Sequence, residues 1–297
     1  MLFQYKGRNR MGTSTSSSGP GAGVGFDPPW IDQIGDALIF PNAPAEETPA
    51  TGEPGRSDTP LDQSSGVDLP ASVAPARRFA SARREMGVFA RTGNQENFKK
   101  AVGHYSRSGM GGARNVAQRM RLSSKSAAGL ISFFQTVRNG TDQRINQWVS
   151  SLVARAATAR DVVDEIIRLV TSDGGSLDEE SCRNSMNGAM SDLLRIQPDV
   201  DLLKMNDTDI WTVVELFLAN EASTRLQLDI GQLFESAKLD PKESVLRMNE
   251  MGEYIRSEIS AQMRQLRETG INPDPKQMAA LIQEALANTF RVYEGAL

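Results

Sequence analysis

The side chain best suited to acid–base chemistry in this chain of 297 residues is its single histidine, His104. A histidine acts as a general base when a nucleophile and an orienting acid lie beside it. No G-x-S-x-G nucleophile elbow occurs here between a strand pattern and a helix pattern. The residues therefore favour a structural or partner-facing histidine at a helix end over a hydrolase centred on His104.

Metal and disulfide chemistry find little support in the composition. The only cysteine, Cys182, cannot form an internal disulfide, which fits a reducing compartment. One histidine and one cysteine also exclude zinc sites built from clusters of these residues. The acidic pairs around Asp161 and Asp178 are typical of helix starts and solvated surfaces. We therefore expect no metal, no cofactor and no enzymatic activity.

Two glycine-rich stretches invite a phosphate-binding interpretation. GPGAGVGF, residues 19–26, follows no strand pattern and lacks the G-K-[ST] of a phosphate-binding loop. SGMGGARN, residues 108–115, is better placed, because its glycines open a helix whose free N–H groups could hold an anion. A plain turn between two helices explains the second stretch more simply.

The net charge of −4 conceals a basic block between two acidic regions. Residues 77–125 carry 12 basic and 2 acidic side chains, whereas residues 1–76 carry 4 and 9 and residues 126–297 carry 17 and 26. Such a block favours contact with nucleic acid or with an acidic protein surface. The candidate anion or partner surface consists of His104, Arg107, Arg114, Arg119, Arg121 and Lys125.

The first quarter of the chain has the composition of a disordered arm. Residues 11–75 are rich in Ser, Thr, Gly, Pro and Ala, and such a segment buries too little apolar surface to fold alone. One apolar island, FDPPWIDQIGDALIF at residues 26–40, interrupts it. The island either packs back on its own domain or anchors a partner, with Trp30 as the hot spot. No secretory signal or membrane-spanning run is present, so we expect a cytoplasmic protein.

From residue 76 onward apolar residues recur at helical spacing, and no convincing strand run occurs. The pattern predicts an all-α, multi-helix, bundle-like domain of roughly seven to nine helices over residues 76–297, behind a disordered arm over residues 1–75. Its basic part is 77–125 and its acidic part is 126–297. The apolar helix over 207–231 is expected at the centre of the core. The predicted helix-end signals are Asn94, Asn139-Gly140, Thr141, the Ser176–Glu179 capping box, Asp240-Pro241 and Asp274-Pro275.

The stretch MGTSTS at residues 11–16 matches a myristoylation signal in form, although it does not stand at the start of the chain. If translation starts at Met11, or if residues 1–11 are removed, Gly12 becomes a free N-terminal glycine. Its amine would lie on a sterically bare tail that can thread into a narrow active site. The stretch therefore has the properties of a substrate tail.

The tail MGTSTSSSGPG…PPW, followed by RFASARREMGVFARTGNQENFKKAVGHYSRSGMGGARNVAQRM, resembles the QatB family of the bacterial Qat anti-phage defence system. The G-H-Y-x-R-x-G-x-G-G motif at residues 103–112 is its most distinctive part, and residues 1–10 depart from the pattern. The resemblance implies a non-enzymatic partner of a QueC-like protein, encoded beside an ATPase and a TatD-like nuclease. It implies that Gly12 accepts a deazapurine-type modification. The implied partner-binding residues are Thr13, Ser14, Thr15 and Ser16 in the threaded tail, and Phe26, Pro28, Pro29 and Trp30 in the docking anchor.

Two functional hypotheses follow from these features, besides the hydrolase. The first is a defence component that binds a QueC-like enzyme and presents Gly12. The second is a nucleic-acid-binding adaptor that uses the block at 77–125 to recruit the nuclease or the ATPase.

Overall fold

A computed structural model describes residues 77–171, 175–232, 234, 240–269 and 273–297. Within these ranges the chain is all-α, as predicted, with ten α-helices, one π-helical segment and no strand. The number of helices slightly exceeds the predicted seven to nine. The expected arm and its apolar island at 26–40 lie outside the described residues. No described helix has the length and apolar character needed to cross a membrane.

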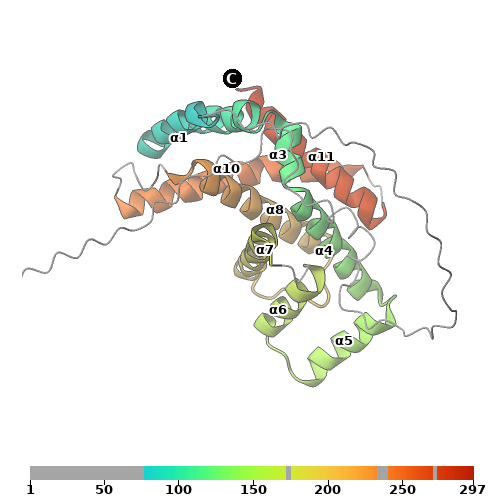
Figure 1. The fold of residues 1–297 in the computed structure, drawn as a ribbon. Helices are drawn as coiled ribbons and strands as arrows, with labels where there is room; N and C mark the ends of the chain where they lie inside the picture. The colour runs from blue at the N-terminus through green and yellow to red at the C-terminus, as the bar shows by residue number, and fades with distance from the viewer. Residues whose placement is uncertain (1–76, 172–174, 233, 235–239, 270–272) are drawn as a thin grey trace, which may run out of the picture.

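The elements follow one another with short connections (Figure 1). In chain order they are α1 (Ala80–Thr92), α2 (Gln95–His104), the π-helical segment η2 (Tyr105–Gly109), α3 (Ala113–Arg119), α4 (Arg121–Asn139), α5 (Gln143–Ala154), α6 (Ala159–Val170), α7 (Leu177–Ile196), α8 (Asp207–Ile230), α10 (Pro241–Glu268) and α11 (Pro275–Glu294).

Local capping signals set most helix ends where the sequence predicts them. The Asn94 side chain accepts a hydrogen bond from the Glu96 N–H at the start of α2. Ser176 and Glu179 form the reciprocal capping box of α7. One prediction is shifted: α5 is capped by Asp142 and not by Thr141, because the carboxylate accepts from two backbone N–H groups of the first turn.

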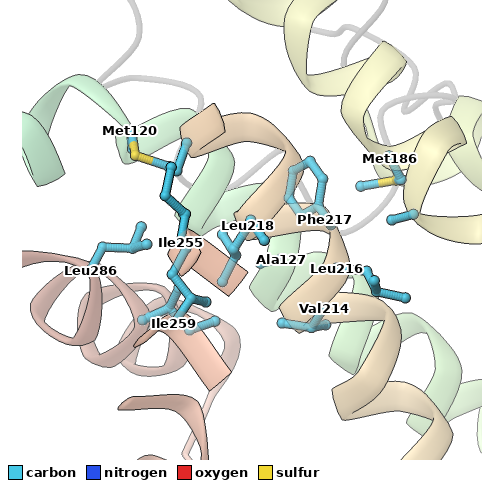
Figure 2. Packing of buried hydrophobic residues seen from close by; sticks show 14 of the residues in the cluster. Met120, Ala127, Met186, Val214, Leu216, Phe217, Leu218, Ile255, Ile259 and Leu286 are labelled. Atoms are coloured by element: carbon cyan, nitrogen blue, oxygen red, sulfur yellow. The ribbon is translucent and has the colours of Figure 1, made fainter. Parts of the chain in front are cut away.

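The apolar helix α8 lies at the centre of the fold, as predicted. Residues on all its sides are buried, which is typical of a helix surrounded by other helices. It packs against α7 on one side, against α10 on another and against α4, while α11 packs on α2, α3, α4 and α10. Figure 2 shows the resulting core, in which Phe217 and Leu218 of α8 lie near Ile255 of α10 and Met186 of α7.

The two ends of the molecule differ in how tightly they pack. At one end, α1, α2, α3 and the last turns of α11 gather near the C-terminus (Figure 1). At the other end, α5 and α6 continue the fold beyond α4 and α7. Helix α5 buries only Ile145 and Leu152 completely, and its Val153 is 67% exposed. The basic block therefore lies at the more compact end.

Candidate functional site

The G-H-Y-x-R-x-G-x-G-G motif includes the π-helical segment η2, which directly continues α2. Single π-helical turns are rare and occur often at functional sites. The apolar spacing predicted a helix here, but it could not distinguish a π-helical turn from an α-helical one. We therefore take this segment as the starting point of the site.

Three of the four glycines of the motif have a structural reason. A Cβ atom on Gly103 would lie 2.5 Å from the backbone oxygen of Tyr293, so only glycine lets α2 approach the end of α11 this closely. A Cβ on Gly109 would lie 2.4 Å from the ring of Phe79. Gly112 has a φ of +118°, a conformation that side chains with a Cβ rarely adopt. The motif is thus a close-packed corner.

Hydrogen bonds fix the turn that follows η2. The Gly112 N–H donates to the Ser106 carbonyl at 2.9 Å. The Asn115 side chain donates to the carbonyl of Met110 at 3.0 Å. The Ser106 hydroxyl donates to Glu294 Oε1 at 2.6 Å and so joins the corner to the end of α11. The glycine turn predicted at 108–112 is therefore rigidly held.

Tyr105 links the corner to the central helix. Its ring is buried and its hydroxyl donates to Asp229 Oδ2 of α8 at 3.0 Å. Arg119 of α3 forms an ion pair with the same carboxylate. Burial raises the pKa of Tyr105 well above its usual range, and the charge of Asp229 adds to the effect. The tyrosine is therefore a neutral donor to a carboxylate whose charge Arg119 neutralises.

The first described residues of the chain pack directly on this corner. Phe79 stacks on Tyr105 with a centroid distance of 5.5 Å and an interplanar angle of 14°. Arg83 donates to the backbone oxygen of Asp229 at 2.9 Å. We call the contact of Phe79 with Tyr105 and Gly109 the arm root, because residues 1–76 join the described domain there.

The arm root brings together only part of the predicted anion surface. Arg107 and Arg114 are exposed beside it, and His104 is half-buried at the last position of α2. Arg119 instead pairs inside the domain with Asp229. The remaining two predicted residues, Arg121 and Lys125, are half-buried at the start of α4. No serine or carboxylate of the described chain is hydrogen-bonded to His104, so a catalytic triad does not form around it there.

A second polar cluster escaped the sequence interpretation. Glu221, Arg225 and Asp229 stand four residues apart on α8 and form a charged ladder on its buried side. Arg225 pairs with Glu221 at 2.8 Å and with Asp178 of α7 at 3.1 Å. The E-x3-R-x3-D spacing within an apolar helix was the available signal, since charges at that spacing share one helix face.

Most polar groups of the ladder have hydrogen-bond or ionic partners on α7. Ser181 and Ser185 donate to Glu221 Oε2 at 3.0 Å and 2.9 Å, and Glu221 itself is fully buried. Burial alone would lower the pKa of Arg225, but the carboxylates of Glu221 and Asp178 outweigh it and raise that pKa. The Nη2 atom of Arg225 is buried without a hydrogen-bond partner in the described structure. The ladder therefore keeps its charges in the interior through pairing.

The cysteine lies beside this ladder and is shielded. Cys182 Sγ lies 3.6 Å from Ser123 Oγ, and the residue is 1% exposed. Burial raises the pKa of its thiol to about 12, with the charge of Glu221 adding to the shift. A thiol in this state is a poor nucleophile near neutral pH, which gives Cys182 a packing role.

The described surface has shallow hollows away from the arm root. One of about 310 Å³ lies between α2, α10 and α11 and is lined by Phe98, Lys99 and Tyr254 among others. Another of about 400 Å³ lies at the connection between α7 and α8, beside Asp199 and Asp201. No group of three or more His, Cys, Asp or Glu residues in the described ranges has metal-binding geometry.

The predicted residues of the tail and of the anchor lie outside the described residues. They are Gly12, Thr13, Ser14, Thr15, Ser16, Phe26, Pro28, Pro29 and Trp30. Their roles stay predictions.

Comparison with known proteins gives one result for the chain. The family model described as "Qat anti-phage system associated protein QatB" matches residues 111–293. The match covers more than half of the chain and begins inside the glycine turn of the motif. No curated protein and no solved structure matches.

Proposed function

Because this chain belongs to the QatB family and so has a role in the Qat anti-phage defence system, we propose that it serves there as a substrate and binding component. It binds a QueC-like enzyme and presents Gly12 for a deazapurine-type modification. In a chain without residues 1–11 the reactive group is the Gly12 amine, and the catalytic groups belong to the partner. The other components of the system, an ATPase and a TatD-like nuclease, are further candidate partners, and the assembly is cytoplasmic.

The observation that carries this proposal is the order of segments at the N-terminal end. A bare Gly-Thr-Ser-Thr-Ser tail starts at Gly12, an apolar anchor with Trp30 follows, and a Pro- and Ala-rich spacer leads to Arg77. A tail without bulky side chains can thread into a narrow site while the anchor provides affinity. An enzyme that modifies a protein substrate needs both a reactive chain end and a binding segment close to that end.

The arm root adds a second contact to this arrangement. Trp30 and Arg77 are separated by 46 residues, and a flexible chain of that length would span roughly 35–40 Å. A partner that holds the anchor can therefore also reach the surface of Arg107 and Arg114. This surface lies on a corner that Gly103, Gly109 and the Tyr105–Asp229 bond keep rigid. Rigid presentation lowers the entropy lost on binding.

Mass spectrometry tests the proposal directly. The chain is purified alone and after co-expression with the other Qat components, and its N-terminal peptide is analysed. We expect a chain that begins at Gly12 and carries the added mass of a deazapurine group only after co-expression. An unmodified N-terminus in both samples would remove the acceptor role.

A matched pair of variants separates the tail from the anchor. Deletion of residues 11–18 should abolish both modification and phage defence. Trp30→Ala should weaken co-purification with the QueC-like partner while Gly12 stays chemically intact. Full defence by the deletion variant would contradict the proposal.

The exposed arginines keep a second function open, that of a nucleic-acid-binding adaptor. Arg107 and Arg114 are available at the surface for phosphate contacts, and such contacts make binding strongly salt-dependent. Under this alternative, the charge reversals R107E and R114E abolish defence, whereas deletion of residues 11–18 does not. Under the favoured function the deletion is the damaging change.

A further inference from the structure

Three arginines close in sequence to the residues of the arm root have no ionic partner among the described residues. Arg77 lies two residues before Phe79, Arg107 lies within η2, and Arg114 lies in the first turn of α3. All three are exposed, and none forms an ion pair with an acidic residue of the described chain. The two acids that bond to the corner are already engaged, since Asp229 pairs with Arg119 and Glu294 accepts from Ser106.

From this imbalance we propose that the acidic stretch at residues 53–68 of the same chain docks on the arginines around the arm root. The stretch contains Glu53, Asp58, Asp62 and Asp68 and a single basic residue, Arg56. Eight residues separate it from the block at 77–125, which has 12 basic and 2 acidic side chains. The stretch and the block have opposite net charges and lie close together in the sequence, so they attract each other.

Tethering makes this contact favourable at any protein concentration. The acids lie 9 to 24 residues before Arg77. A flexible chain of that length spans roughly 15–30 Å, comparable to the roughly 17 Å radius of gyration of a domain of this size. The effective local concentration of the acids is therefore of the order of millimolar.

The docked stretch competes with other anions for these arginines. Each pair of exposed charges is weak and is screened over about 8 Å at physiological salt, so the stretch exchanges quickly. It nevertheless occupies the arginines that an anionic partner would use.

A spin label provides the direct test in the full chain. Since Cys182 is buried and its pKa is raised to about 12, a cysteine introduced by Ser64→Cys can be labelled selectively. We expect the amide signals of Arg107 and Arg114 to relax at least threefold faster than that of Val153 on α5 at low salt. The difference should vanish in 0.5 M NaCl, where the Debye length is only a few ångströms.

Two triple variants supply the matched control. D58N/D62N/D68N removes three charges near the arm root and should reduce the enhancement to its high-salt level. D27N/D32N/D36N removes the same charge about three times farther along the chain, where the effective concentration is about fivefold lower. The second variant should therefore keep most of the faster relaxation of the Arg107 and Arg114 amide signals.

Binding of an anionic probe, a 20-nucleotide oligo-dT, tests the consequence. At low salt D58N/D62N/D68N should bind it at least fivefold more tightly than the unaltered chain, and adding R107E and R114E should cancel the gain. Equal enhancement in both triple variants, equal relaxation over α5 and the arm root, or unchanged probe binding would each overturn the proposal. In the last case the surface is open to a separate anionic partner.

Discussion

The Tyr105 hydroxyl lies 3.0 Å from Asp229 Oδ2, although 124 residues separate the two in sequence. This bond joins the corner that carries the G-H-Y-x-R-x-G-x-G-G motif to the central helix. Because Arg119 neutralises the same carboxylate, the charge of Asp229 is tolerated in a partly buried place. The corner thus depends on a short polar chain through three elements.

Removing the Tyr105 hydroxyl should show how much its hydrogen bond to Asp229 contributes to stability. Tyr105→Phe keeps the ring on Phe79 but deletes the bond to a charged acceptor, so we expect a loss of about 1.5–3 kcal/mol in the free energy of unfolding. Urea denaturation followed by circular dichroism checks it. Tyr254→Phe is the control, because its hydroxyl donates no hydrogen bond to a described residue, and it should change stability by less than about 0.5 kcal/mol. Equal effects of both changes would refute the link.

Two helical glycines should respond oppositely to alanine. Gly103→Ala forces the chains apart at the Tyr293 carbonyl and should cost about 1–3 kcal/mol. Gly129→Ala, within α4, meets nothing within 4 Å and should stabilise the fold by about 0.5–1 kcal/mol through helix propensity. The same denaturation experiment measures both, and a stabilising Gly103→Ala would show that α2 and α11 are not in close contact.

The charged ladder should behave as one unit. Arg225→Met leaves Glu221 buried without its cation, and we expect a loss of about 3–5 kcal/mol. Glu221→Gln leaves Arg225 with Asp178, so it should cost less. The double variant should lose less free energy of unfolding than the sum of the two single losses, because the two residues interact directly. Strict additivity would argue against a direct pair.

Glu215 on α8 should make stability fall as the pH rises. Desolvation raises its pKa above 4.5, against the smaller effects of the Ser260 hydrogen bond and of nearby arginines. The folded state therefore binds its proton more tightly, and stability falls between pH 4.5 and the raised pKa. Glu215→Gln should be more stable than the unaltered chain at pH 7, and this advantage should shrink on acidification.

Glu165 on α6 should show the opposite dependence of stability on pH in the same experiment. Its hydrogen bond from Arg155 lowers its pKa, so its stabilising effect is complete above pH 4.5 and is lost as the pH falls through the lowered value. Glu165→Gln should therefore be slightly less stable at pH 7 and equal at low pH. Thermal melts of both variants at pH 3.5, 5 and 7 distinguish the two slopes.

The single thiol should report on global unfolding. With a pKa of about 12 and 1% exposure, Cys182 should not react with a disulfide reagent at pH 8 in the folded protein. One equivalent should react in 6 M guanidinium. Rapid reaction without denaturant would mean that α7 opens easily around Cys182.

Local signals explain why the helices could be predicted so well. Asn94, the Ser176–Glu179 pair and Asp240-Pro241 act within one turn, so the sequence itself contains their partners. Where two cap candidates stand side by side, as at Thr141 and Asp142, spacing could not choose between them.

The site was harder to predict, because its contacts are non-local. The run from Arg107 to Lys125 gave no hint that Arg119 turns inward to Asp229 while Arg107 and Arg114 stay outside. The ladder on α8 was overlooked for the same reason, since Arg225 finds Asp178 only once α7 packs on α8. Charge density along a sequence identifies a basic region but not which of its cations are neutralised within the fold.

The order of synthesis matters for the arm root. Ser106 bonds to Glu294 across 188 residues, and Tyr105 waits for Asp229. At about 5–20 residues per second, a ribosome needs roughly 10–40 s to add the chain between Ser106 and Glu294. The N-terminal tail is therefore outside the ribosome long before the corner can close. An enzyme that acts on nascent chains would meet the tail first and the finished domain afterwards.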